Sequence, residues 1–284
     1  MKTKIIIYFL LILPLISFSQ ADIKGVICNH EKSPLPYTNV ALLKNNGGTS
    51  SNEKGEFQIN NICIDDTIKI TNIAYYPKLI GVSKLINNDT IYLEEQIKQL
   101  SEITVINFVK FKNEKDIGFL DYVSNASYSL HPGNQMAVFI ENKIKKEGWL
   151  KAVSFKVKEK GTCKNSIRVR VLQLDPKDNE PSYDILNADI ILNFNDLKRT
   201  NHIDISRFKI LMPKEGVFVV LEWVGPEIYC DENSYTTISG NSKVASNLVW
   251  LNQRDRVWDH KDIPQLRNGN FMTPNISLKI AYKL

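Results

Sequence analysis

Residues 67–73 read TIKITNI, and this alternation of polar and apolar side chains is typical of a β-strand with one buried face. Ile68 and Ile70 fall on the same face of that strand. Short apolar runs separated by Pro, Gly and Asn recur from residue 22 to residue 95, and none of them has helical periodicity. The spacing of the turns predicts a small β-sandwich of about seven strands.

Several motifs in this region follow one another in a fixed order. They are Ile23-x-Gly25-x-Ile27, residues 34–40 (PLPYTNV), Gly48-Thr49, residues 54–57 (KGEF) and residues 91–93 (IYL). In this order they resemble the carboxypeptidase regulatory-like domain, whose fold is a transthyretin-like (prealbumin-like) β-sandwich. Gly55 allows the tight turn that delivers Phe57 to the core. The resemblance implies an accessory module that carries no catalytic residues.

The resemblance also implies a cellular setting. In secreted proteins of Bacteroidetes-type bacteria this module commonly precedes an outer-membrane receptor of the TonB-dependent kind. Only 179 residues follow Val105, which is too few for a barrel of about 22 strands of roughly 10 residues each. The sequence therefore predicts the accessory module without the transporter.

The N-terminus has the pattern of a secretory signal peptide over residues 1–20. Lys2 and Lys4 precede the apolar run 5–18, and small residues follow at a cleavage site. The run is shorter than the roughly 20 residues of a spanning helix, and no later segment approaches that length. Export is therefore expected, with the mature chain in the periplasm, at the outer-membrane surface or outside the cell.

Beyond the first sandwich (residues 21–95), we expect a polar junction over 96–125 and a larger jelly-roll-like sandwich over 126–284, so the fold class is all-β. In residues 149–158 alternation puts Trp149, Val153, Phe155 and Val157 on one face, with Lys151 as an exception. It puts Arg168 and Arg170 on the outer face of the next strand. In residues 217–224 it directs Trp223 into the core and Glu222 outward.

Export makes the four cysteines informative, because oxidising compartments permit disulfides. Cys28 and Cys63 lie in the first third of the chain, and Cys163 and Cys230 lie in the rest. One bridge per domain is the simplest pairing, and four buried thiols are an equally weighted alternative.

The chain has no recognisable catalytic motif, and neither a metal nor a cofactor is expected. His30, His131, His202 and His260 are scattered without zinc-ligand spacing. Oxygen-bearing residues at 175–180 could bind calcium, but Asp, Asn and Pro are also the usual turn formers, and the turn is favoured.

A polar segment near the C-terminus is the candidate ligand-binding site. Its proposed binding residues are Trp258, Arg254, Arg256 and Asp259, with the indole stacking on a sugar ring and the charged groups bonding hydroxyls. The alternative, favoured about two to one because aromatic residues dominate core burial, is that Trp250 and Trp258 anchor the sandwich core.

These observations predict an exported, non-enzymatic binding or assembly protein of the cell envelope. A net charge of +5, or +3 without the leader, does not suggest a nucleic-acid partner. An envelope glycan and an outer-membrane protein are the expected partners. The alternatives are an accessory subunit of a TonB-dependent receptor and a hydrolase of envelope glycan or peptide. A hydrolase would use Asp255, Asp259 and Glu222, and two carboxylates would converge at about 5–9.5 Å.

Overall fold

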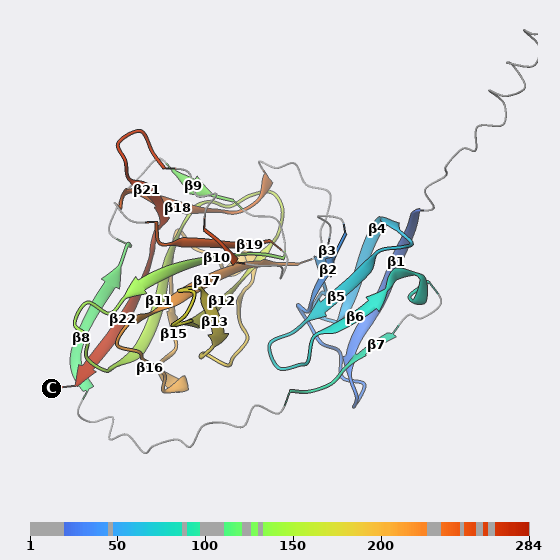
Figure 1. Cartoon of the computed structure of the whole chain (residues 1–284), viewed down its shortest axis with the longest axis horizontal. Helices are drawn as coiled ribbons and strands as arrows, with labels where there is room; N and C mark the ends of the chain where they lie inside the picture. Colours follow the sequence, from blue (N-terminus) through green and yellow to red (C-terminus); the bar gives the residue numbers. More distant parts are fainter. Residues whose placement is uncertain are drawn as a thin grey trace, which may run out of the picture.

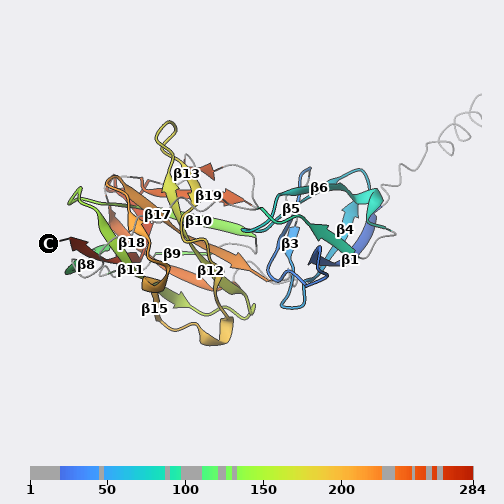
Figure 2. The ribbon, with the colours of Figure 1, turned by 90° about the horizontal axis from the view of Figure 1, so that it is seen from below.

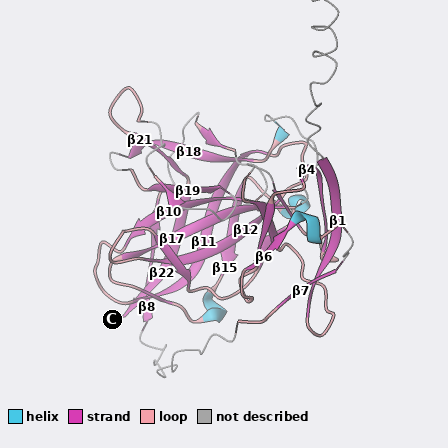
Figure 3. Cartoon of the chain, turned by 45° about the vertical axis from the view of Figure 1, so that its right-hand side comes forward, coloured by secondary structure: helices cyan, strands magenta, loops and turns pink. Residues whose placement is uncertain are grey.

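The computed structural model describes residues 20–44, 48–86, 90–96, 111–120, 126–129, 133–225, 234–244, 247–253, 258–260 and 265–283. These residues form β-strands and short 3-10 helices (Figure 3). Two sandwiches lie side by side, as two perpendicular views agree (Figures 1 and 2). Across the described ranges, none of the helices has the length and apolar character needed to cross a membrane. The predicted leader lies outside the described residues except for Gln20.

The first sandwich contains seven strands in two sheets, which confirms the expected architecture. Its elements are β1 (Gln20–Asn29), β2 (Asn39–Leu42), β3 (Gly48–Ser50), β4 (Glu56–Cys63), β5 (Thr67–Thr71), β6 (Lys78–Gly81), the 3-10 helix η1 (Val82–Lys84) and β7 (Thr90–Leu93). One sheet has the order β4-β1-β7 and the other has the order β3-β2-β5-β6. Ile68 and Ile70 of β5 are fully buried between them, as the alternation predicts.

The turn before β4 depends on Gly55. Its φ of +75° lies in the left-handed region, and a Cβ there would approach the Ile27 carbonyl oxygen to 2.6 Å. The turn places Phe57 in the buried cluster of this sandwich, together with Ile27 and Ile91. The role expected of this glycine is confirmed.

The second sandwich also consists of two sheets. Its strands are β8 (Phe111–Gly118), β9 (Ser127–Tyr128), β10 (Asn134–Glu141), β11 (Gly148–Glu159), β12 (Ser166–Leu174), β13 (Pro181–Asp184), β14 (Ile190–Leu192), β15 (Thr200–Asp204), β16 (Leu211–Met212), β17 (Gly216–Val224), β18 (Thr237–Val244), β19 (Val249–Gln253), β20 (Trp258–Asp259), β21 (Phe271–Pro274) and β22 (Ile276–Lys283). Two 3-10 helices, η3 (Phe194–Asp196) and η4 (Ser206–Phe208), flank β15. One sheet has the order β13-β12-β17-β10-β19-β20, and the other has the order β21-β18-β11-β22-β8.

The pairing of its framework strands has the logic of a jelly roll. In chain order the framework is β8, β10, β11, β12, β17, β18, β19 and β22. The first of these pairs with the last (β8 with β22), and the successive inner pairs are β10 with β19, β11 with β18 and β12 with β17. This nested antiparallel pairing confirms the jelly-roll-like prediction.

Between the two sheets lies a large apolar core. Trp223 is fully buried there, and its indole Nε1 donates to the Thr236 carbonyl oxygen at 3.0 Å, so its predicted inward orientation is confirmed. The prediction for Trp149 is wrong, because a β-bulge between Leu150 and Ala152 shifts the register. Leu150 therefore enters the core, while the Lys151 ammonium lies 4.3 Å from the Trp149 ring centroid.

The second sandwich begins earlier than expected, because β8 lies in the range predicted to be a junction. It pairs with β22 at the edge of its sheet. Glu114, Lys115 and Asp116 are exposed on it. Charged residues commonly protect edge strands. Because three charged residues follow one another in β8, its sequence lacks the alternation of polar and apolar residues by which a strand is predicted.

The cysteines follow neither alternative completely. Cys28 and Cys63 are free thiols. Cys63 lies opposite Gln20, eight residues along β1 from Cys28, which is roughly 26 Å at about 3.3 Å per residue. A disulfide needs Cα atoms within about 7 Å. The alternative that predicted a Cys28–Cys63 disulfide in the first sandwich is therefore wrong. Cys163 is disulfide-bonded, and Cys230 lies outside the described residues.

Tyr128 makes the stability of the second sandwich sensitive to alkaline pH. Its buried hydroxyl donates to the Met272 carbonyl oxygen, and burial raises its pKa above the usual 10.0. Stability from this group is complete below pH 10 and is lost as the pH rises, because the unfolded chain ionises first. We expect Tyr128→Phe to cost about 1 kcal/mol at neutral pH and to flatten the alkaline decline in the free energy of unfolding, measured in urea. An unchanged decline would contradict this assignment.

Candidate functional site

A row of polar side chains crosses the outer face of the sheet that contains β12, β17, β10 and β19. In register across neighbouring strands, Arg168 lies opposite Glu222, Glu222 opposite Gln135, and Gln135 opposite Asn252. The row ends at Trp258 on β20, the partner of Asn252. Side chains directly opposite one another on adjacent strands share a face, so the fold aligns five residues that are far apart in the chain.

The charged members of this row are buried, although they point away from the core. The alternation correctly placed Arg168 and Glu222 on the outer face, but it gave no sign that this part of the face is buried. Their side chains are only 7% and 2% exposed, because the first sandwich lies against this part of the sheet. The sequence signal that could have indicated this is a pair of arginines and a glutamate within otherwise apolar strands.

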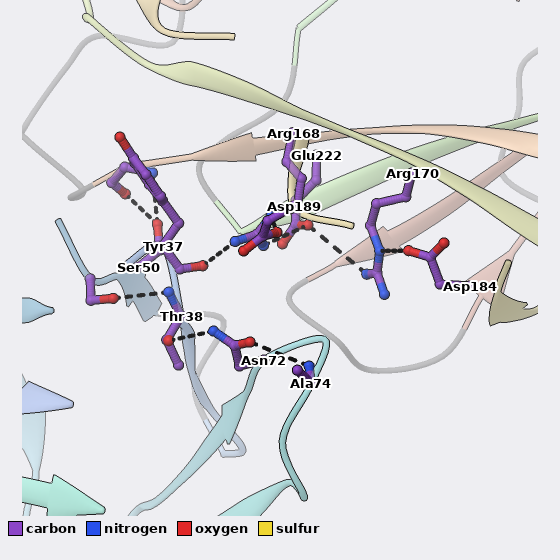
Figure 4. Close-up of polar contacts among 12 residues, drawn as sticks. Tyr37, Thr38, Ser50, Asn72, Ala74, Arg168, Arg170, Asp184, Asp189 and Glu222 are labelled. Atoms are coloured by element: carbon purple, nitrogen blue, oxygen red, sulfur yellow. Dashed lines mark hydrogen bonds and ion pairs between the residues drawn. The ribbon is translucent and has the colours of Figure 1, made fainter. Parts of the chain in front are cut away.

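Arg168 is the centre of the ionic cluster (Figure 4). Its Nη1 donates to Glu222 Oε2 at 3.1 Å, and its Nη2 donates to the Tyr37 carbonyl oxygen at 2.6 Å. The Nε lies 2.8 Å from Asp189 Oδ1 as an ion pair rather than a hydrogen bond. One guanidinium therefore binds two carboxylates of its own domain and one backbone carbonyl of the other.

Arg170 lies beside this cluster on the same face of β12. Its Nε donates to Asp184 Oδ2 at 3.1 Å, and its Nη1 lies 4.0 Å from Glu222 Oε2. The other carboxylate oxygen of Asp184 accepts a hydrogen bond from the Leu186 backbone N–H at 2.8 Å. Asp184 and Asp189 were not anticipated from the sequence, since both lie in short segments after β12.

The Tyr37 carbonyl is aimed at Arg168 by the loop between β1 and β2. The Tyr37 backbone has a φ of +52°, which is uncommon for a residue with a side chain. The Thr38 backbone N–H donates to Ser51 Oγ at 2.9 Å, and the Asn72 amide donates to the Thr38 hydroxyl at 2.8 Å (Figure 4). Burial raises the pKa of the Tyr37 phenol, as does nearby Glu53, whereas Arg168 opposes this shift.

A second contact joins the two sandwiches at Ser50. The Gly225 backbone N–H donates to Ser50 Oγ at 2.7 Å, and the Ser50 hydroxyl donates to the Gly225 carbonyl oxygen at 2.8 Å. Gly225 follows β17 with a φ of +133°, which favours glycine. Both groups are buried, so neither has water as an alternative partner.

A cleft of about 390 Å³ opens between the sandwiches beside these contacts. The second domain lines it with Gln135, Arg168, Arg170, Ser182, Tyr183, Asp184, Glu222 and Asn252. The first domain contributes Asn39, Lys69, Thr71, Asn72, Ile73, Tyr75, Pro77 and Gln96. Nearly every lining side chain carries a hydrogen-bonding group, and the arrangement suits a polar ligand held between two rigid sheets.

Of the described residues predicted to bind a ligand, only Trp258 lies next to the lining of this cleft, as the strand partner of Asn252. Trp258 is half-buried and packs against an apolar cluster on the outer face that includes Phe218 and Trp250. Asp259 is exposed and is paired with Leu251 rather than Asn252, so it points to the opposite face of the sheet from Trp258. Arg254 and Arg256 lie outside the described residues, and ligand binding by this segment stays a prediction.

The carboxylates proposed for a hydrolase do not converge where they are described. Glu222 lies on the outer face and binds Arg168, whereas Asp259 lies on the opposite face, and Asp255 lies outside the described residues. Within the described ranges there is no group of three or more His, Cys, Asp or Glu residues positioned to hold a metal ion. In the loop at 175–180, the Asp175 carboxylate accepts the Lys177 backbone N–H at 2.8 Å, as expected of a turn.

Comparison with protein families decides the identity of the first sandwich. The family model of the CarboxypepD_reg-like domain matches residues 23–105. The chain carries a carboxypeptidase regulatory-like domain. No curated protein matches the chain. Because the family match ends at residue 105, the function of the second sandwich has to be argued from its own geometry and from its contacts with the regulatory-like domain.

Removal of the charge on Glu222 should destabilise the protein. Glu222→Gln leaves the buried guanidinium of Arg168 with less compensation, and we expect a loss of about 3–5 kcal/mol in the free energy of unfolding. Glu141→Gln is the matched control on β10, because the Glu141–Lys145 pair is exposed and should contribute less than about 1 kcal/mol. Urea unfolding measures both, and equal effects would contradict the assigned importance of the cluster.

Weakening the Arg168–Tyr37 and Ser50–Gly225 contacts between the sandwiches should separate them. The double variant Ser50→Ala, Arg168→Lys removes the hydroxyl that binds Gly225 and shortens the reach to the Tyr37 carbonyl. Each buried group left unsatisfied costs about 1–3 kcal/mol. We expect a larger radius of gyration by small-angle X-ray scattering with unchanged far-ultraviolet circular dichroism. An unchanged radius would mean that other contacts hold the sandwiches together.

Proposed function

We propose that this chain is an exported, non-enzymatic binding protein of the cell envelope, and that it holds a neutral glycan in the cleft between its two sandwiches. The single observation that carries the proposal is a polar cleft whose arginines and carboxylates are already paired with one another. The regulatory-like domain supports an accessory rather than a catalytic role, by resemblance. Export rests on the leader pattern of residues 1–20.

The charges at the cleft favour a neutral ligand. The cationic groups are Lys69, Arg168 and Arg170, and the carboxylates are Asp184, Glu222 and Asp189, so their formal charges cancel. An anionic or cationic ligand would have to compete with an existing ion pair, and the released partner would remain buried. Breaking such a pair is costly. A neutral ligand avoids that cost.

The uncharged groups at the cleft match a polyhydroxylated ligand. Side-chain amides at Asn72, Gln96, Gln135 and Asn252 line it, and an amide both donates and accepts hydrogen bonds, as a sugar hydroxyl does. Tyr75 and Tyr183 add aromatic surface on which the apolar face of a sugar ring can pack. This combination supports a saccharide more than a fully apolar ligand.

The non-enzymatic part of the proposal is supported by the same ion pairs. Acid–base hydrolysis of a glycosidic bond uses two carboxyl groups on opposite sides of the bond. The two carboxylates that line the cleft, Asp184 and Glu222, are each bound to an arginine. They therefore serve to position arginine side chains, and the hydrolase stays the alternative hypothesis.

Glycan binding is testable with the purified chain and a panel of soluble oligosaccharides. We expect neutral gluco-, manno- and N-acetylhexosamine oligomers to include a binder, and oligogalacturonate to bind more weakly. Tyr183→Ala should weaken binding about fivefold, since one aromatic contact contributes about 1 kcal/mol. Tyr76→Ala is the control, because Tyr76 is comparably exposed (49% against 60%) and does not line the cleft.

The result can also separate the cleft from the segment around Trp258. Loss of binding in Tyr183→Ala with normal binding in Trp258→Ala would favour the cleft, and the reverse result would favour the segment at 254–259. Preference for oligogalacturonate would contradict the neutral-ligand argument. Release of reducing sugar from a bound oligomer would overturn the non-enzymatic proposal in favour of the hydrolase.

A further inference from the structure

The regulatory-like domain has two strand edges on the same side, and they differ in how they are protected. β6 and β7 are the terminal strands of their sheets. Past β7, the Tyr76 backbone N–H donates to the Glu94 carbonyl oxygen and the Gln96 N–H donates to the Ala74 carbonyl oxygen. Within β7, the Tyr92 carbonyl oxygen accepts a hydrogen bond from the Lys78 ammonium at 2.6 Å. The chain itself therefore joins the residues after β7 to those before β6, and one lysine satisfies a carbonyl of the β7 edge.

The β6 edge is protected in part, because Pro77 precedes this four-residue strand and Lys78 lies on it. β6 pairs with β5 along one side, over Lys78–Gly81, and no described strand pairs with its other side. Leu79 at the centre of β6 is 63% exposed. Tyr76 and Ile86, which flank this strand, are also among the exposed large hydrophobic residues. Exposed apolar side chains beside an unpaired strand edge indicate an interaction surface.

Beside this edge lies a groove of about 360 Å³ between the two sheets. Its lining residues are Lys78, Leu79, Ile80, Gly81, Lys84, Leu85, Thr90, Ile91 and Tyr92. Leu85 and Ile91 belong to the buried cluster of the sandwich and Ile80 packs against it, so the groove gives access to apolar side chains. The charged residues of this lining are two lysines, without a carboxylate among them.

We propose that the β6 edge is a docking site for an extended segment of a partner protein that combines apolar and acidic side chains. The segment pairs its backbone with β6 and extends the sheet, as in strand addition to other exposed edges. Side chains on one face of the added strand enter the groove toward Ile80 and Leu85, and those on the other face contact Leu79. Acidic residues complement Lys78 and Lys84. This surface is distinct from the cleft, and the proposal does not depend on glycan binding.

The test is a selection of random peptides on phage against the intact chain, followed by titration of the recovered peptides as synthetic fluorescent probes. We expect recovered peptides to combine apolar residues with Asp or Glu and to lack proline. Leu79→Glu and Lys84→Glu should each weaken binding about tenfold or more, and binding should weaken as salt screens the charges. Methylation of alternate backbone nitrogens of the peptide should abolish binding, because main-chain pairing needs those N–H groups.

Matched controls separate this edge from general surface effects. Leu43→Glu changes another exposed leucine of the same domain, and Lys54→Glu changes an exposed lysine in the turn before β4. Neither should alter binding by more than about twofold. All four substitutions lie at exposed positions, so folding should be preserved, as circular dichroism would verify.

Three results would overturn the proposal. The first is the absence of enriched peptides, or enrichment of peptides without acidic residues. The second is binding that is unaffected by Leu79→Glu. The third is concentration-dependent dimerisation of the chain that Leu79→Glu abolishes, since a second copy of this chain would then be the occupant of the edge.

Discussion

The relation between the two sandwiches depends on one desolvated guanidinium. Arg168 is almost fully buried on the outer face of a sheet, where an unpaired charge would be prohibitively costly. Glu222 and Asp189 of its own domain compensate the charge. A further N–H of the group is satisfied only by the Tyr37 carbonyl of the other domain. The hydrogen bond from Arg168 therefore favours the arrangement in which the first sandwich packs on this sheet. In that arrangement the Tyr37 carbonyl points toward the guanidinium.

Such a cluster contributes more to orientation than to net stability. Desolvation offsets much of the attraction within a buried ion pair, whereas removal of one partner is strongly destabilising. Apolar packing would tolerate small shifts between the domains, but hydrogen bonds of the Arg168–Tyr37 and Ser50–Gly225 kind tolerate them poorly, because they depend on direction. The contacts beside the cleft consequently favour one relative placement of its two walls, and such preorganisation lowers the cost of binding.

Much of the fold could be predicted from alternation and turn chemistry. The seven strands of the first sandwich, the inward Trp223 and the jelly-roll-like class of the second domain were all predicted from local patterns. The site could not be predicted in the same way. Alternation distinguishes the two faces of a strand, but it does not indicate that a neighbouring domain covers the outer one, as happens to Glu222. The bulge after Leu150 and the charged edge strand β8 also break the simple period, since both depend on pairing with β22.

The outer face of the β12–β17–β10–β19 sheet is divided between two kinds of chemistry, and the division explains why only one end is a ligand-site candidate. Toward the regulatory-like domain its side chains are Arg168, Glu222, Gln135 and Asn252, and farther along the same strands they are Leu172, Phe218, Ala137 and Trp250. The apolar end is already covered in part by His260, whose ring centroid lies 4.1 Å from that of Trp250. It therefore behaves as a small local core.

At the polar end, by contrast, the regulatory-like domain satisfies the buried charges and leaves an accessible space lined by amides and tyrosines. A domain docked through apolar contacts would have closed that space, whereas one docked through directional polar contacts at a few points keeps it open.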